Sequence, residues 1–362
     1  MSSLCLEDTM KNLFQHAADL SPSQTNNLTC ASVGMLLAGS TQLSKIARWL
    51  HREGQQDSRI QYLGRLLDSD YLTPQRIYQP LVRQALRGHH PSEWHLILDR
   101  STLDGTTADV LMVALNFRHR AIPLVWQVNP LGGTSAQQQV ALLAQVRPLL
   151  PPTSSVIVHG DSEFGSVDMM RFVRAHQWHF ILGQSAPTLY RLPGSTTWRR
   201  LDTLTVPPRQ GVYVPQVEWT QQHRYGPINL FAFHRPYQNS PRSPRREIRY
   251  YATSLPIAHT LRQRGRRRWG IECLFRDCKS SGWNIEASEV GTFARYDSLL
   301  TLLAVNYLWA TCMGRWLCKT GHRFEVDARS QRHLSLFRIG WDWLIHQSVL
   351  ERPCPPLLTL YA

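Results

Sequence analysis

The chain has 362 residues, of which 43% are hydrophobic and 18% are charged, and it carries a net charge of +14. This composition excludes an intrinsically disordered chain and predicts a globular protein of two or three domains. The strong positive charge favours a polyanionic partner. The seven cysteines form no Cys-x-x-Cys pair, which argues against a zinc site or a disulfide framework. No signal peptide is recognisable, so a cytoplasmic location is expected.

Residues 1–90 are predicted to form a helical N-terminal domain. Within it, residues 28–38 and 41–50 are expected to be two helices joined by a short turn, with Thr41 as the N-cap of the second. This outline is typical of a DNA-binding helix-turn-helix, and an ordinary helical hairpin is the alternative. The exposed side of the second helix would carry Lys45, Arg48 and His51.

From residue 91 to 184 the pattern changes to strands that alternate with helices. Asp99 ends the first strand, and Asp161 lies just beyond the fourth. An acidic residue at the C-terminal end of a strand points into the crevice where open α/β sheets bind ligands. The expected strands are residues 94–98, 108–116, 121–128, 154–158 and 178–182, with helices at 135–149 and 166–176.

Residues 185–255 break this alternation and predict a β-rich insertion. Its strands are expected at residues 199–206, 211–220, 228–234 and 248–254. The segment from Arg242 to Arg268 contains nine arginines and a single acid, Glu247. Such a bias toward one sign of charge favours binding to a phosphate backbone over a merely solvated face.

The segment Arg266–Trp283 is predicted to be a helix with one charged and one apolar stripe. At 100° per residue, Arg268, Glu272 and Lys279 lie within about 40° of one another. A carboxylate between two cations suits a site for metal ions and phosphate, whereas a surface ion pair of Arg268 with Glu272 is the alternative. The apolar stripe consists of Ile271, Leu274, Phe275 and Cys278.

Residues 298–314 carry no charge and are read as a buried core helix, because they are too few for a comfortable membrane span. No membrane association is expected. The stretch 256–320 would complete the domain begun at residue 91, and residues 321–362 would form a C-terminal helix and tail.

Asp99, Asp161 and Glu272 are the candidate ligands for a pair of divalent ions, because two-metal phosphoryl transfer needs converging carboxylates. Hard oxygen ligands favour Mg²⁺ or Mn²⁺. Other polar residues lie nearby in sequence. Asp104 is expected in a turn, Glu163 beside the site, and Asp277 on another face of the helix, while His159 lacks the partner motif of a histidine metal centre.

These motifs resemble DDE transposases of the insertion-sequence-4 family. That family places one Asp after its first core strand, a second after its fourth, and a Glu within a Y-x2-R-x3-E-x6-K signature that follows a β-strand insertion. Here LILDR supplies Asp99 and VIVHGDSEFGS supplies Asp161, while Gly265 stands at the tyrosine position and departs from the pattern. The rest of the signature is matched by Arg268, Glu272 and Lys279.

The resemblance covers residues 28–345 and implies an α/β fold. Its core would be a ribonuclease-H-like mixed sheet with a β-strand insertion and an N-terminal helical domain that binds DNA ends. It implies that two Mg²⁺ or Mn²⁺ ions are bound by the catalytic residues Asp99, Asp161 and Glu272. It further implies that DNA phosphates are held by Arg268 and Lys279.

The resemblance also implies a reaction and its partners. Water nicks double-stranded DNA at the transposon ends, and the freed 3′-OH then attacks target DNA, within a homodimer that pairs the ends. Family members often cut through a hairpin with a flipped base, for which Trp198 and Trp219 are candidate stacking platforms, although core packing is favoured for both. Two alternatives stay open: a catalytically inactive DNA-binding relative, and a ribonuclease-H-like nuclease without transposition.

Overall fold

The protein is described by a computed structural model, in which part of the basic segment lies outside the described residues. Arg242, Arg245, Arg246 and the acid Glu247 are among the residues left out. The described ranges are 4–17, 19–118, 120–152, 154–208, 210–234, 248–256, 260–279, 282–355 and 358–360.

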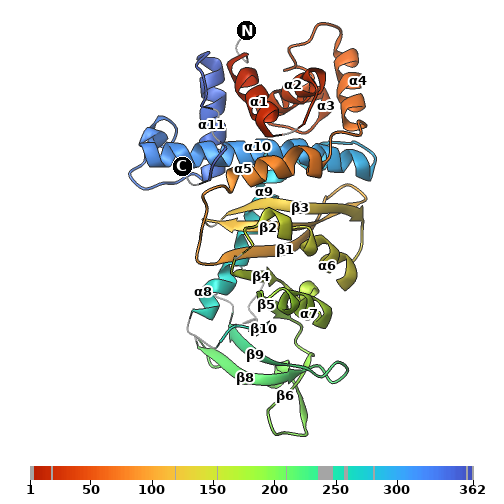
Figure 1. Cartoon of the computed structure of the whole chain (residues 1–362), viewed down its shortest axis with the longest axis vertical. Helices are drawn as coiled ribbons and strands as arrows, with labels where there is room; N and C mark the ends of the chain where they lie inside the picture. Colours follow the sequence, from red (N-terminus) through yellow and green to blue (C-terminus); the bar gives the residue numbers. More distant parts are fainter. Residues whose placement is uncertain are drawn as a thin grey trace.

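Within these ranges, ten strands form one continuous sheet with the order β3-β2-β1-β4-β5-β10-β9-β8-β6-β7 (Figure 1). The strands are β1 (Trp94–Thr102), β2 (Ala108–Phe117), β3 (Arg120–Pro130), β4 (Val156–Gly160), β5 (His179–Gln184), β6 (Leu189–Arg191), β7 (Trp198–Arg200), β8 (Gly211–Trp219), β9 (Tyr225–His234) and β10 (Ile248–Thr253).

The first five strands give the core its character. β1, β2 and β3 form an antiparallel meander, and β4 and β5 then continue from β1 in parallel. This strand order and these directions are those of a ribonuclease-H-like sheet, so the predicted fold class is confirmed. The five strands were all predicted, because each is an apolar run bounded by turn residues.

The insertion extends this sheet. β10 pairs antiparallel with β5, and β9, β8, β6 and β7 follow outward. The expected strand at 199–206 was wrong, because only Trp198–Arg200 is extended and a 3₁₀ turn, Leu201–Thr203, follows. The short strand β6 was not predicted, since three residues carry too little pattern to be recognised.

Helices cover both faces of the core and one end of the molecule. They are α1 (Leu4–Ala17), α2 (Pro22–Ala38), α3 (Leu43–Ile46), α4 (Gln56–Leu67), α5 (Gln79–Ala85), α6 (Ala136–Ala144), α7 (Val167–Ala175), α8 (Leu261–Gly265), α9 (Trp269–Cys278), α10 (Phe293–Thr320) and α11 (Leu336–Val349). Figure 1 shows α6 and α7 in front of the strands and α9 behind them, where α9 packs on β1, β2 and β3. The long helix α10 lies between β3 and the N-terminal helices.

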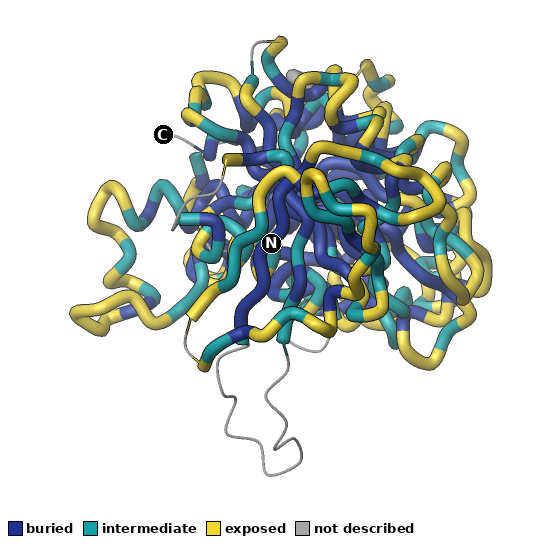
Figure 2. Tube along the Cα trace, turned by 90° about the horizontal axis from the view of Figure 1, so that it is seen from below, coloured by how far each residue is buried: buried dark blue, intermediate teal, exposed yellow. Residues whose placement is uncertain are grey.

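The predicted core helix at 298–314 is the middle of α10, and nearly every side chain along it is buried. Burial is concentrated in the interior of the molecule, while the peripheral loops are exposed (Figure 2). Within the described part of the chain, no helix is long and apolar enough to cross a membrane.

The expected helix-turn-helix was wrong in its second half. α3 has only four residues, Leu43–Ile46, which is too short for a recognition helix, although Lys45, Arg48 and His51 are exposed as predicted. Thr41 is not the N-cap. Its hydroxyl instead donates to the carbonyl oxygens of Trp283 (3.3 Å) and Asn284 (3.1 Å) and so ties the N-terminal helices to the segment after α9.

Candidate active site

The segment predicted as one helix, Arg266–Trp283, directly follows α8 and begins with a 3₁₀ turn at Arg266–Arg268; the α-helix itself, α9, ends at Cys278 and not at Trp283. The turn is held by Asn116 at the end of β2, whose Nδ2 donates to the carbonyl of Arg267 at 2.8 Å. The apolar stripe packs as predicted on the sheet, since Ile271 and Leu274 are fully buried. This packing fixes which way the charged side of α9 faces.

Asp99 lies on β1, and its position is set by the strand. Across the strand pair it faces Met112 of β2, and its own Oδ1 accepts a hydrogen bond from the backbone N–H of Arg100 at 2.9 Å. The side chain is only 12% exposed. One carboxylate oxygen is therefore fixed by the local backbone, and the other points toward α9.

Asp161 directly follows β4 and begins a 3₁₀ turn, Ser162–Phe164. Its Oδ1 accepts from the backbone N–H of Glu163 at 2.8 Å. The neighbouring strand allows this turn to lie close, because Gly183 of β5 has no side chain: a Cβ there would lie 2.8 Å from the backbone of Asp161 and Ser162. β4 and β5 thus place the second aspartate beside the first strand.

Arg268 joins two of the predicted acids. Its guanidinium donates to Asp99 Oδ2 at 2.9 Å and forms a second, short contact with Glu272 Oε1. Burial alone would lower the pKa of Arg268, but the carboxylates of Asp99, Glu272 and Asp161 outweigh it and raise that pKa. All three predicted acids therefore act on one half-buried cation.

The electrostatics of Asp99 agree with this convergence. Burial raises the pKa of Asp99 to about 6; the Arg268 charge opposes this rise, and Asp161 and Glu272 add to it. Like charges that disfavour one another's ionisation are typical of carboxylates gathered at a functional site.

The donor set is suitable for a hard divalent cation, because it consists of carboxylate oxygens alone. As the side chains stand, however, no group of three His, Cys, Asp or Glu residues among the described residues is arranged to hold a metal ion. Arg268 spans two of the acids and places a positive charge beside them. In their chemistry, the three carboxylates fit such an ion.

Lys279 lies apart from this group. α9 ends at Cys278, and Lys279 has non-helical dihedral angles (φ −93°, ψ −124°), so its side chain does not continue the predicted charged stripe. Its ammonium group contacts the carbonyl of Thr102 and pairs with Glu286 at 2.8 Å. Asp277, as predicted, faces elsewhere and pairs with Arg120 at 3.1 Å.

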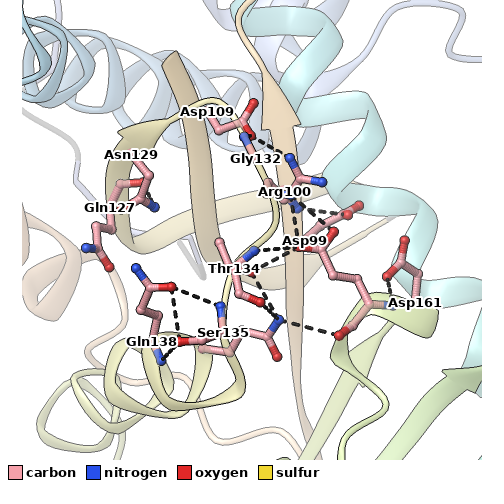
Figure 3. A network of polar contacts seen from close by, with 12 residues as sticks. Asp99, Arg100, Asp109, Gln127, Asn129, Gly132, Thr134, Ser135, Gln138 and Asp161 are labelled. Atoms are coloured by element: carbon pink, nitrogen blue, oxygen red, sulfur yellow. Dashed lines mark hydrogen bonds and ion pairs between the residues drawn. The ribbon is translucent and has the colours of Figure 1, made fainter. Parts of the chain in front are cut away.

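Two residues beside the acids were not predicted. Arg100, next to Asp99, forms ion pairs with Glu163 (2.9 Å) and with the buried Asp109 (2.5 Å), and these contacts are part of the polar network in Figure 3. Their only signal in the sequence was that Arg100 adjoins one candidate acid and that Asp109 interrupts an apolar strand.

A cleft of about 1280 Å³ adjoins the site. Its wall includes Asp161 and Glu272, and five arginines bring positive charge to it. These are Arg118, Arg249, Arg266, Arg267 and Arg268. The five arginines outnumber the three acids of this wall, Glu93, Asp161 and Glu272, and an excess of positive charge in a cleft favours polyanions such as DNA.

The remaining candidates lie outside this cleft. Trp219 is 1% exposed, so it belongs to the core as favoured, and Trp198 is covered on one face by the Arg191 guanidinium, 5.1 Å from its ring centre. His159 is buried and bonds to His95 through ring nitrogens 2.9 Å apart. It does not line the cleft that contains Asp161 and Glu272.

Comparisons with known proteins bear on this geometry. Residues 92–309 match the family model described as a transposase DDE domain, and this range contains all three acids. No curated protein matches the chain. Among solved structures, the piggyBac transposase synaptic complex with hairpin DNA, determined by cryo-EM, shows 12% identity and a TM-score of 0.42 over 98% of this chain and 80% of that chain.

The family match spans more than half of the sequence and includes the five core strands, α9 and most of the charged cleft. This protein belongs to the DDE transposase family.

Proposed function

We propose that this transposase belongs to the insertion-sequence-4 group and cuts and joins DNA at the ends of an insertion sequence. Asp99, Asp161 and Glu272 would bind two Mg²⁺ or Mn²⁺ ions. Such ions lower the pKa of an attacking water or 3′-OH and neutralise charge on the leaving oxygen. The observation that carries this proposal is that Arg268 contacts Asp99 and Glu272 at an arginine-lined cleft whose wall also includes Asp161.

The chain's own cations have two roles in this proposal. Arg268 keeps Asp99 and Glu272 together in the absence of DNA, because an unpaired buried charge would be costly. When substrate enters, Arg268 exchanges these carboxylates for a DNA phosphate, a ligand that suits its planar fork. Lys279 would make the same exchange, leaving Glu286 for a phosphate.

The other parts of the chain are assigned supporting roles. Residues 1–90 would recognise the DNA end, and the core of 91–184 and 256–320 would perform the chemistry. The insertion, 185–255, would line the approach for the duplex. Residues 321–362 would pack against the core, and two copies of the chain would pair two ends of double-stranded DNA before joining them to a target.

The test uses the DNA that flanks the gene, searched for terminal inverted repeats and then supplied as a labelled duplex with Mg²⁺. We expect Asp161→Asn to slow nicking at the repeat by at least about 10³-fold, since a lost metal ligand removes several kcal/mol of transition-state stabilisation. Asp168→Asn is the matched control, because Asp168 is 66% exposed on α7, seven residues away. It should nick like the wild type.

The same assay separates the alternatives. An inactive DNA-binding relative would bind the repeats without nicking them in any metal, and wild type and Asp161→Asn would then behave alike. A nuclease without transposition would nick DNA but never join the freed 3′ end to a target duplex. Either result would overturn the proposal.

A further inference from the structure

We propose that Glu163 and Arg100 are positioning residues, which together fix the two aspartates at a set separation. This inference rests on the proposed role of Asp99 and Asp161 as metal ligands. Neither positioning residue would contact metal or DNA. Each would act through the aspartate beside it in the chain.

The two residues link the aspartate segments directly. Arg100 Nε donates to both carboxylate oxygens of Glu163, at 2.9 and 3.1 Å. Arg100 adjoins Asp99 at the end of a buried part of β1, and Glu163 lies two residues after Asp161 in the turn that follows β4. The expectation that Asp99 ends its strand was wrong, because β1 continues to Thr102; the ion pair therefore links the middle of β1 with the turn that follows β4.

The backbone of each positioning residue also orients its aspartate. The N–H of Arg100 donates to Asp99 Oδ1 at 2.9 Å, and the N–H of Glu163 donates to Asp161 Oδ1 at 2.8 Å. One oxygen of each carboxylate is therefore held by the chain, which leaves the other to bind a ligand. The two backbone N–H groups therefore orient the aspartates, and the ion pair between the side chains sets the separation of the two segments.

Further hydrogen bonds hold both partners of the Arg100–Glu163 ion pair in place. Arg100 also reaches Asp109 of β2 at 2.5 Å, and Asp109, which is 1% exposed, accepts the N–H of Gly132 at 3.1 Å. Thr134, just before α6, donates its hydroxyl to Glu163 at 3.0 Å. Figure 3 shows Arg100, Asp109, Gly132 and Thr134 near Asp99 and Asp161. A guanidinium that donates through Nε to Glu163 and through Nη1 to Asp109 is held from two sides, which opposes its rotation.

This arrangement has a physical purpose in the proposed site. Two aspartates close enough to share metal ions repel each other, and repulsion would spread them when no metal is bound. A neighbouring ion pair that holds both segments opposes the spreading. Residues that orient metal ligands from behind typically contribute about 10- to 100-fold to metal affinity.

The experiment measures Mn²⁺ affinity of the full-length protein without DNA, by calorimetric titration, in which the ion displaces Arg268 from Asp99 and Glu272 in every variant alike. Glu163→Ala should weaken binding about 10- to 100-fold. Glu163→Gln keeps the shape and one oxygen acceptor and should weaken it less. The matched control is Glu218→Ala, because Glu218 is 27% exposed and paired with Arg191, while Glu163 is 26% exposed and paired with Arg100. Its Mn²⁺ affinity should equal that of the wild type.

A second measurement separates positioning from folding. Metal-free affinity for the terminal repeat should stay within about twofold of wild type in Glu163→Gln, while its single-turnover nicking at saturating DNA should slow with its Mn²⁺ affinity. Wild-type Mn²⁺ affinity and nicking in both Glu163 variants would overturn the inference. If Asp99→Asn and Asp161→Asn also bind Mn²⁺ and nick normally, the proposed function itself fails.

Discussion

Two glycines in one helical segment, Gly265 and Gly270, differ in the space around them. Gly265 has helical dihedral angles (φ −59°, ψ −29°), and a Cβ there would meet only Ile181, at 3.9 Å. At Gly270 a Cβ would lie 2.7 Å from the carbonyl oxygen of Arg120 and 2.9 Å from Asn116 Nδ2. Gly270 therefore permits α9 to approach β2 and β3 closely, whereas Gly265 has room for a side chain where the family has a tyrosine.

The two positions give a paired prediction about stability. Gly265→Ala should raise the free energy of unfolding by about 0.5–1 kcal/mol, because alanine reduces the entropy lost in a helix. Gly270→Ala should lower it by about 1–3 kcal/mol through overpacking against backbone that cannot yield. Denaturant unfolding followed by circular dichroism measures both. Equal shifts in the same direction would contradict the packing difference.

Arg268 shows how far residue-level prediction reached. The spacing placed it beside Glu272, and the structure has that contact. Its predicted partner was a DNA phosphate, whereas in the folded chain its partners are the acids themselves. The helical wheel compares positions within one helix and contains no information about Asp99, which comes from a strand 169 residues away.

At the scale of the element, α9 is anchored at its C-terminal end by a buried ion pair. Asp277 accepts from Arg120 of β3 at 3.1 Å, and its side chain is 8% exposed. Burial raises the pKa of Asp277 to about 6, although Arg120 opposes the rise. Desolvation therefore destabilises the Asp277 carboxylate by more than its ion pair with Arg120 stabilises it. The packing of α9 holds this charge in place.

This pKa predicts a dependence of stability on pH. The carboxyl titrates near 3.8 in the unfolded chain and near 6 in the folded protein, so between these values the folded protein keeps a proton that the unfolded chain has released. Stability should fall by up to about 3 kcal/mol as the pH rises from about 4 to about 6. Denaturant unfolding at a series of pH values should show a weaker fall in stability for Asp277→Asn than for the wild type, and an unchanged fall for Asp168→Asn. The same dependence of stability on pH in all three proteins would refute the prediction.

The prediction of helices and strands succeeded where a long apolar pattern marked the element, and it failed at the ends of helices. The five core strands and the middle of α10 were found from such patterns. Lys279 was misplaced because the wheel was extended past Cys278, where the helix stops, and the sequence there has no proline to mark the end. The length of α3 was overestimated, because the apolar residues of 41–50 have helical spacing. The sequence does not reveal that Thr41 hydrogen-bonds to the distant Trp283 and so cannot cap a helix.

At the scale of the whole molecule, the helical end and the catalytic sheet share one core. A single cluster of buried side chains includes Leu6 of α1, Leu36 of α2, Val158 of β4 and Trp309 of α10. Trp283, which follows α9, is fully buried in it and stacks on Trp341 of α11 at 4.7 Å. This continuity could not be read from composition, because it depends on contacts between residues hundreds of positions apart.

Such a core predicts that the proposed N-terminal domain and the catalytic sheet unfold together. Trp283→Ala should lower the free energy of unfolding by about 3–5 kcal/mol, as expected for truncating a buried aromatic side chain. Hydrogen exchange should show the same loss of protection for Leu36 in α2 as for Val158 in β4, because both amides would open only in the global transition. Trp198→Ala, in the outer part of the sheet, serves as the control.

In that control only a partly exposed contact with Arg191 is lost, which is worth about 0.5–1 kcal/mol. If Trp283→Ala instead releases α2 while β4 keeps its full protection, the two parts are separate folding units. Thr41 and Trp283 would then be a docking contact between them. If both lose protection equally, the helices expected to recognise DNA and the sheet that carries the acids form one body, and DNA bound at one end is held rigidly relative to Asp99 and Asp161.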